Sequence, residues 1–466
     1  VAIMLPDGPG VHVAFVGCEL AGLVVMGIGP RAGTDEIRHL VERAGARAFV
    51  TRPEWRGEDM GALFEALSGD LPALETHVRV SGQLELDDGC YADAKDPGPD
   101  VLAGRALDAD DLFLLNSTSG TTGMPKCVTH HQGRWFHFHD LAAESGEMTS
   151  EDVFLSALPA PFGFGLWTAH FTPAALGAPC IVMENFTPEA MIEAIEAHRV
   201  TVLAAVSTQF IMMLNSPAID AHDLSSLRAL YTGGEAVPYE RAAEFEERTG
   251  ASVLQFYGSN ETGALSRTTT RDTREKRLRT AGRLIDAMNV RLFDVEGNDV
   301  TASGEGQPAC KGPLASRGYW DDEAANAKLF TKGGWLLTGD ICRIDDEGYL
   351  SVIGRTADFI IRGGKNISGP AVEDVVSGHP AVALAAAVAM PDPVFGERVC
   401  VYVELRAGES LTLEQLVSHL ENRGVTREWF PERLIVEAEL PRASGGKVAK
   451  GALREDIRRR VAAESR

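Results

Sequence analysis

Short apolar runs alternate with amphipathic stretches along most of this chain. Thr34 and Asp35 can cap a helix that extends to 45, and an apolar strand is expected over 47–51. Thr187 and Pro188 give a cap and a first-turn proline for a helix that reaches about 198. Further apolar runs predict strands over 201–206, 227–232 and 253–257. This alternation is typical of a doubly wound α/β fold.

The pattern changes twice toward the C-terminus. From about 288, short strands over 290–294 and 349–353 are separated by Asp/Gly turns, which indicates a β-rich subdomain. Beyond Arg355 a compact region has strand signals of its own over 381–390 and 399–405 and a helix signal over 411–422. We therefore expect a large N-terminal domain (1–354), a hinge (355–358) and a small α+β C-terminal domain (359–466).

Composition excludes several classes of partner. A length of 466 residues indicates more than one domain, and the net charge of −23 argues against nucleic acid and against an anionic membrane surface. The seven cysteines are scattered without a Cys-x-x-Cys pair, as in a reduced cytoplasmic protein. No apolar run is long enough for membrane insertion. Because Val1 already lies in an apolar run, we expect a preceding segment to be missing from this sequence.

The segment 117–126 reads Ser-Thr-Ser-Gly-Thr-Thr-Gly-Met-Pro-Lys. Glycines let backbone N–H groups approach an anion, hydroxyls donate further hydrogen bonds, and lysine adds a point charge. The spacing is not that of a Walker A loop. A flexible surface linker would have a similar composition, but it would not explain the apolar run 112–115 before it or Val128 after it. We therefore predict a strand that leads into a polyphosphate-binding loop.

Four further groups of residues have chemistry that suits a nucleotide site. In 255–263 a strand leads into Tyr257, which could stack on a base, Asn260 and Thr262, which could bind phosphate, and Glu261, which could bind Mg²⁺. A capped turn would look the same. Asp340 ends an apolar strand and could accept both hydroxyls of a ribose, or it could be a turn residue. Glycine-flanked bases at 354–366 suit a hinge or an ordinary linker, and a lysine such as Lys447 is often just solvated.

Together and in this order, these motifs resemble those of the adenylate-forming superfamily of acyl-CoA synthetases, peptide-synthetase adenylation domains and luciferases. The resemblance runs nearly end to end. It implies a large N-terminal AMP-binding domain and a small C-terminal domain that rotates between two half-reactions. It also implies an acid–thiol ligase that uses ATP, Mg²⁺ and coenzyme A.

The resemblance assigns roles residue by residue. The catalytic residues are Lys447, which bridges the substrate carboxylate and the α-phosphate, together with Glu261 at the metal and Lys126 in the phosphate loop. The other ATP or AMP contacts are Ser117, Thr118, Ser119, Gly120, Thr121, Thr122, Gly123, Gly233, Gly234, Glu235, Ala236, Tyr257, Gly258, Asn260, Thr262, Asp340 and Arg355. Gly363 and Gly364 match the loop that lines the thiol tunnel.

Some positions depart from the family pattern. Cys127 stands where glycine is usual and could stiffen the loop, and Asn260 replaces a common threonine but still donates hydrogen bonds. Ala357 stands at the hinge position that usually carries Asp or Lys, and 368–371 departs from the usual Pro-x-Glu spacing. Adenylation is therefore better supported than thioester formation.

The acyl pocket is expected at Phe162, Gly163, Phe164 and Gly165, together with Gly258. Amino-acid-activating relatives usually carry aspartate at the position of Gly163, so an amino acid is disfavoured. Glycines that widen a pocket and phenylalanines that line it suit an aromatic, alicyclic or otherwise bulky apolar acid. Both phenylalanines could instead belong to the core.

The residues leave three alternatives open. The chain could stop at the acyl-AMP or load a carrier protein in trans, it could be a catalytically silent relative that binds nucleotide or acyl ligand, or it could be an oxygenase like luciferase. Retention of Lys126, Glu261, Asp340, Arg355 and Lys447 together argues against silence. A homodimer is common in the family.

Overall fold

The computed structural model describes residues 1–81, 85–86, 99–118, 124–234, 237–294, 296–355, 359–362, 365–442 and 448–464, with backbone alone at 85, 86, 99, 100, 355, 365 and 366. These residues form two compact units. Unit 1 comprises Val1–Phe186, Ser259–Gly263 and Lys311–Leu336; unit 2 comprises Thr187–Gly258, Ala264–Cys310 and Leu337–Arg466. Positions 356–358 of the predicted hinge lie outside the described residues, so the boundary at 355–358 stays a prediction.

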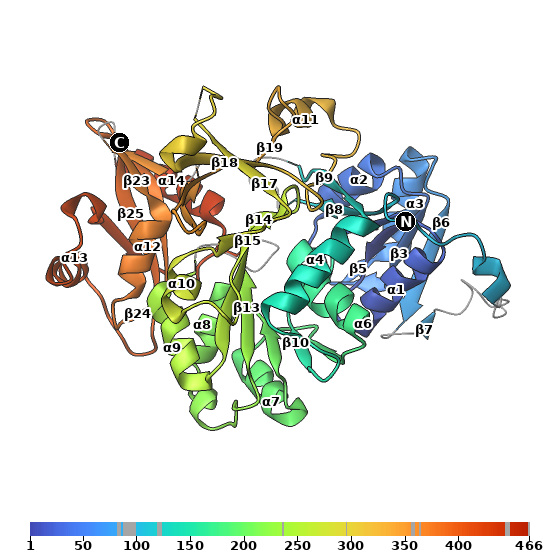
Figure 1. The fold of residues 1–466 in the computed structure, drawn as a ribbon, viewed down its shortest axis with the longest axis horizontal. Helices are drawn as coiled ribbons and strands as arrows, with labels where there is room; N and C mark the ends of the chain where they lie inside the picture. The colour runs from blue at the N-terminus through green and yellow to red at the C-terminus, as the bar shows by residue number, and fades with distance from the viewer. Residues whose placement is uncertain are drawn as a thin grey trace. The chain divides into compact units, whose positions relative to one another are not determined.

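Unit 1 is built on a largely parallel sheet of strand order β7-β6-β3-β1-β2-β8-β9, in which only the outer strands β7 and β9 run antiparallel to their described neighbours (Figure 1). Its strands are β1 (Ala2–Met4), β2 (Val25–Gly27), β3 (Ala48–Thr51), β6 (Thr76–Ser81), β7 (Glu85–Leu86), β8 (Leu112–Ser117) and β9 (Cys127–His131). A short hairpin pairs β4 (Glu54–Trp55) with β5 (Glu58–Asp59), and β10 (Phe154–Ser156) pairs in parallel with β11 (Cys180–Val182).

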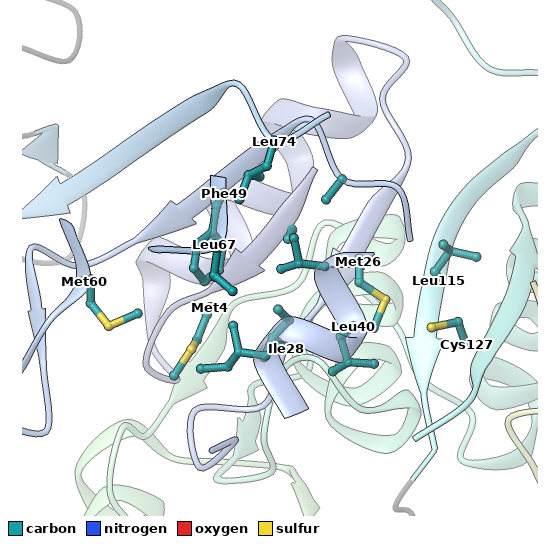
Figure 2. Close-up of a cluster of buried hydrophobic side chains, with 14 residues drawn as sticks. Met4, Met26, Ile28, Leu40, Phe49, Met60, Leu67, Leu74, Leu115 and Cys127 are labelled. Atoms are coloured by element: carbon teal, nitrogen blue, oxygen red, sulfur yellow. The ribbon is translucent and has the colours of Figure 1, made fainter. Parts of the chain in front are cut away.

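Helices and apolar side chains cover the sheet of unit 1. The helical segments are α1 (Pro9–Leu20), α2 (Thr34–Arg43), α3 (Met60–Asp70), η1 (Pro99–Leu102), α4 (Gln132–Ser145), α5 (Gly163–Leu166), η2 (Trp167–Phe171), α6 (Thr172–Leu176) and α11 (Glu323–Leu329). Figure 2 shows the core cluster that joins α2 and α3 to the strands, with Phe49 in β3, Leu40 in α2 and Leu67 in α3. Cys127, the departure after the phosphate loop, lies in this cluster beside Leu115, so its side chain packs in the core.

Unit 2 begins with the second part of the α/β fold. Strands β12 (Val202–Ala204), β13 (Ala229–Gly233), β14 (Ser252–Ser259), β15 (Gly263–Arg267) and β16 (Arg283–Leu284) follow one another in the sheet, and β12, β13 and β14 are parallel. The helices are α7 (Pro188–His198), α8 (Ser207–Asn215), η3 (Pro217–Asp220), α9 (Tyr239–Thr249) and α10 (Arg274–Arg279). Thr187 caps α7 as expected, because its hydroxyl accepts from the Ala190 N–H at 3.2 Å. The expected cap of α2 is wrong: the cap residue is Gly33.

The β-rich and C-terminal parts follow the predicted order. The first contains β17 (Asn289–Phe293), η4 (Thr301–Ser303), β18 (Glu305–Lys311), β19 (Leu336–Leu337), β20 (Asp340–Ile344) and β21 (Leu350–Arg355). The second contains β22 (Phe359–Arg362), β23 (Lys365–Ser368), α12 (Gly369–Ser377), β24 (Val382–Asp392), β25 (Gly396–Leu405), α13 (Leu413–Asn422), η5 (Arg427–Trp429), β26 (Arg433–Val436) and α14 (Lys450–Glu464). Buried valines of β25 pack with Val372 of α12 and Leu416 of α13 in a separate core. No helix among the described residues has the length and apolar character that crossing a membrane requires.

Candidate active site

The predicted phosphate loop joins two antiparallel strands. Ser117 at the end of β8 lies opposite Cys127 at the start of β9. Thr118 closes the base of the loop, because its N–H donates to the Lys126 carbonyl at 2.9 Å and its hydroxyl accepts from the Lys126 N–H at 3.1 Å. Lys126 itself is exposed. The predicted strand before the loop is confirmed, whereas Ser119, Gly120, Thr121, Thr122 and Gly123 lie outside the described residues.

A tyrosine joins the loop lysine to the predicted metal-binding glutamate. The Tyr319 hydroxyl donates to Glu261 Oε1 at 2.8 Å, and Lys126 Nζ lies 4.8 Å from the centre of the Tyr319 ring. Burial, followed by the neighbouring Glu261 carboxylate, raises the pKa of Tyr319, so the hydroxyl stays protonated and remains a donor. Tyr319 therefore contacts the Lys126 ammonium group with its ring and the Glu261 carboxylate with its hydroxyl, and all three residues belong to unit 1.

The chain brings Tyr319 to this place by extending the edge of β9. Val128 and Tyr319 form an antiparallel bridge, and the Trp320 N–H donates to the Cys127 carbonyl at 2.7 Å. Sequence reasoning missed Tyr319. The one signal that could have found it is the pair of adjacent aromatic residues after Gly318, which lacks the spacing of a helix or a buried strand.

A buried arginine fixes the turn that carries Asn260 and Glu261. Arg134 of α4 is only 7% exposed, and its guanidinium donates to the carbonyls of Leu314 and Asn260 and, at 3.3 Å, to that of Glu261. Charge-assisted hydrogen bonds of this kind orient a backbone strongly. The sequence gives no hint of this role, because Arg134 lies more than a hundred residues from each of these three carbonyls.

Thr262 holds the same turn from within. Its side chain is fully buried, and its hydroxyl accepts from the Ser259 N–H and donates to the Gly263 carbonyl, both at 2.9 Å. A phosphate could reach this hydroxyl only if the turn opened. The predicted phosphate contact by Thr262 therefore lacks geometric support. The side chain of Asn260 is half-buried and takes no part in these hydrogen bonds.

The predicted acyl segment forms the start of a helix. Phe162 is the N-terminal cap of α5, and both Phe162 and Phe164 are half-buried, so neither is a core phenylalanine. A side chain at Gly163 would meet Asn260 Oδ1 at 2.4 Å. At Gly165 it would meet the Pro159 carbonyl at 2.3 Å, so close backbone packing explains this glycine without a pocket. A role for these four residues and Gly258 in an acyl pocket stays a prediction.

The predicted adenosine contacts lie in unit 2. The Tyr257 hydroxyl donates to Asp340 Oδ2 at 2.7 Å and accepts from Cys342 Sγ at 3.4 Å. Burial, followed by the neighbouring Cys342 and Asp340, raises the pKa of Tyr257 well above its ordinary value. The hydroxyl therefore keeps its proton and remains a donor to Asp340. The backbones of Asp340 and Arg355 lie opposite each other in the antiparallel pair of β20 and β21.

The other predicted residues are placed only in part. Gly233 ends β13, and Gly234 follows it with a positive φ of 77°, a backbone conformation that favours glycine. Nothing is described of the Arg355 side chain. Six further predicted residues lie outside the described part of the chain, namely Glu235, Ala236, Ala357, Gly363, Gly364 and Lys447.

The residues of unit 1 suit Mg²⁺ bound mainly by a nucleotide. No cluster of three His, Cys, Asp or Glu that could hold a metal occurs among the described residues. Glu261 supplies one hard carboxylate, and Mg²⁺ commonly takes one or two carboxylates together with substrate phosphates and water. A single glutamate beside a phosphate loop fits that donor set.

The carboxyl group of Asp7 binds the backbone just before the predicted acyl segment, and its effect on stability can be measured. Asp7 Oδ1 accepts from the Ala160 N–H at 2.7 Å, yet burial raises the pKa of Asp7 to about 6. Between the ordinary pKa and 6, the unfolded chain is ionised here while the folded chain keeps its proton, so stability falls as pH rises through this window. When the pH rises from 5 to 7, the free energy of unfolding of Asp7→Asn, measured in urea, should therefore rise by about 1 kcal/mol relative to that of the wild type. Asp110→Asn, at an exposed aspartate, serves as the control. A free-energy difference between Asp7→Asn and the wild type that is the same at pH 5 and pH 7 would contradict the raised pKa of Asp7.

Comparisons with known proteins agree with these motifs. The family model for AMP-binding enzymes matches residues 1–320, and the model for the C-terminal domain of AMP-binding enzymes matches 371–447. The indoleacetate–CoA ligase of Aromatoleum aromaticum is 34% identical over 99% of this chain and 89% of its own length. The medium-chain fatty-acid–CoA ligase of Escherichia coli is 30% identical over 99% of this chain and 82% of its own length.

A solved structure shows the same fold. The anthranilate CoA ligase AuaEII in complex with anthranoyl-AMP superposes with a TM-score of 0.86 at 23% identity, covering 99% of this chain and 88% of that one. The expected mixed α/β architecture, with a large N-terminal and a small C-terminal domain, is thus confirmed. This chain belongs to the family of AMP-binding, adenylate-forming enzymes.

Proposed function

We propose that this chain activates a carboxylic acid with ATP to give an acyl-adenylate and pyrophosphate, and then transfers the acyl group to coenzyme A. The observation that carries the proposal is the arrangement of Lys126, Tyr319 and Glu261 at the base of the phosphate loop. It provides a cation for phosphate oxygens and a carboxylate for Mg²⁺ within one unit of the fold.

In the first step, a carboxylate oxygen of the acid attacks the α-phosphorus of ATP in line, and the bond to pyrophosphate breaks. Two anions must approach each other, so the protein contributes mainly positioning and charge neutralisation. Lys126 and the loop hydroxyls hold the departing phosphates, and Lys447 bridges the carboxylate and the α-phosphate. Glu261 would hold Mg²⁺, which neutralises phosphate charge when bound.

The nucleoside is assigned to unit 2. Asp340 accepts the ribose hydroxyls, and Tyr257 and the backbone at 233–236 enclose adenine. The Tyr257–Asp340 hydrogen bond supports this assignment, since it holds the aromatic ring and the carboxylate together before any ligand binds. Arg355 contributes near the phosphate.

The second step requires a thiol. We assign Gly363 and Gly364 to the tunnel for coenzyme A and 355–358 to the hinge about which the C-terminal domain turns. The thiol gives up its proton to solvent, and its sulfur forms a bond to the acyl carbon while the bond between the acyl carbon and the phosphate oxygen of AMP breaks. The cytoplasm supplies ATP and coenzyme A, so we place the reaction there; a homodimer is compatible with it.

The acid is proposed to be aromatic, alicyclic or otherwise bulky and apolar. Half-buried Phe162 and Phe164 offer apolar faces, and Gly163 has no carboxylate to pair with an ammonium group. The similarity to an indoleacetate–CoA ligase supports a ring acid, and the similarity to a medium-chain fatty-acid ligase makes a linear acid the necessary comparison.

Mass spectrometry of the products tests the proposal. Benzoates, alicyclic acids and fatty acids are each incubated with ATP and Mg²⁺, with and without coenzyme A, and both acyl-AMP and acyl-CoA are measured. Acyl-CoA from a ring acid is expected. Acyl-AMP that accumulates with coenzyme A present would instead show an enzyme that passes its product to another acceptor, such as a carrier protein.

A further inference from the structure

A buried amide lies next to the predicted acyl segment without using its full hydrogen-bonding capacity. Asn116 is the penultimate residue of β8 and is completely buried. Its Nδ2 has no hydrogen-bond acceptor among the described residues. Buried polar groups are nearly always paired, so an unpaired donor at the entrance to a phosphate loop requires an explanation.

The surroundings of Asn116 indicate what the donor faces. Its Oδ1 accepts a long hydrogen bond of 3.5 Å from Asn260 Nδ2, so the two amides lie side by side. An ideal Cβ built on Gly163 would lie 4.0 Å from Asn116 Nδ2 and 2.4 Å from Asn260 Oδ1. The two amides therefore face the bare backbone of Gly163, at the position where amino-acid-activating relatives carry an aspartate.

The absence of a side chain at Gly163 is consistent with this arrangement. A side chain there would require the Asn260 side chain to move, and a carboxylate would pair with an ammonium group. The amides replace that charge with neutral hydrogen-bonding groups, which can recognise a polar atom without requiring a charged acid. A site built to pair with a polar atom discriminates strongly against analogues that lack it, because its own buried group is then left unpaired.

We propose that Asn116 determines specificity by donating a hydrogen bond from Nδ2 to an acceptor atom on the acid. The preferred acids are then ring acids with a ring nitrogen or an ether, carbonyl or hydroxyl oxygen, rather than hydrocarbon rings of the same shape. This inference rests on the proposed function and narrows its substrate class.

Matched pairs of acids test the inference directly. Benzoate is compared with pyridine-2-, 3- and 4-carboxylate, and each methylbenzoate with the methoxybenzoate of the same position, by kcat/KM for acyl-AMP formation. Wild-type enzyme is expected to favour at least one acceptor-bearing acid over its hydrocarbon partner by about 10-fold or more. Asn116→Leu, which is similar in size but lacks the donor, should bring that ratio close to one while the KM for ATP stays within about twofold.

The outcomes separate this inference from the proposed function. If wild-type enzyme activates none of these acids and no alicyclic or fatty acid either, the proposed function itself fails. If it activates only alicyclic or fatty acids, the inference fails and the function stands. If it activates the matched acids without a preference for acceptors, or prefers aminobenzoates that only donate, the inference likewise fails and the function stands. A loss in Asn116→Leu that is equal for all acids would place Asn116 at the reacting carboxylate and would also overturn it. Asn116→Ala replaces the leucine variant if that variant does not fold.

Discussion

Glu261→Gln is expected to lower the rate of acyl-AMP formation by about 10²–10³-fold, comparable to removing one preorganised electrostatic group. Glutamine has the same shape as glutamate and its side-chain oxygen can still accept from the Tyr319 hydroxyl, which donates to Glu261 Oε1 at 2.8 Å. The fold and the turn should therefore be retained while the negative charge is lost. The Mg²⁺ concentration that gives half the maximal rate should rise, because one carboxylate for the ion is missing.

Tyr319→Phe is the matched control for this prediction. It keeps the Glu261 charge and removes the hydrogen bond, so its effect should be about 10-fold, and it should leave the Mg²⁺ dependence nearly unchanged. Single-turnover measurement of acyl-AMP at several Mg²⁺ concentrations distinguishes the two variants. A Glu261→Gln enzyme with a rate near that of the wild type would refute the assignment of Glu261 to the metal.

Arg134→Met should lower the free energy of unfolding by about 3–5 kcal/mol, as expected when one partner of a buried, charge-assisted network is removed. The buried guanidinium binds the carbonyls of Leu314, Asn260 and Glu261 and donates from Nη1 to His130 Nδ1 at 2.9 Å. Methionine fills much of the space but cannot donate, so several backbone acceptors lose their partner together. The turn that carries Glu261 should loosen as a consequence.

Arg317→Met provides the control for Arg134→Met. Arg317 is also an arginine of unit 1, but it is 61% exposed and pairs with Asp110 at the surface, so its loss should change stability by less than about 0.5 kcal/mol. Urea unfolding of both variants, followed by circular dichroism, gives the comparison. Equal unfolding midpoints would show that the carbonyl contacts of Arg134 do not hold the turn.

Hydrophobic periodicity was sufficient to predict some of the strands and helices of both units, but not most of them. The strand expected over 47–51 is β3 (Ala48–Thr51), and the helix expected over 411–422 is α13 (Leu413–Asn422). Such elements are encoded locally, by apolar spacing and caps. The cap of α2 was wrong because glycine also tolerates the required backbone conformation, and Thr34 became the first helical residue.

The candidate site could be predicted only where its chemistry lies in contiguous motifs. Lys126, Glu261 and Asp340 each stand in a short pattern of residue types that suits a nucleotide. Tyr319, Arg134 and Asn116 could not be found in this way. Each contacts a residue that is far away in the sequence. The contacts arise only in the folded chain, from the pairing of β9 with 318–320 and from the packing of α4 and β8.

Acid-dependent exchange of labelled pyrophosphate into ATP measures adenylate formation by this chain. The reversal of adenylation requires acid, ATP and Mg²⁺ but no thiol, so exchange without coenzyme A measures the first half-reaction alone. We expect exchange that depends on a ring acid and falls by about 10²–10³-fold in Glu261→Gln. Consumption of ATP without any acid-dependent exchange would contradict adenylate formation by this chain.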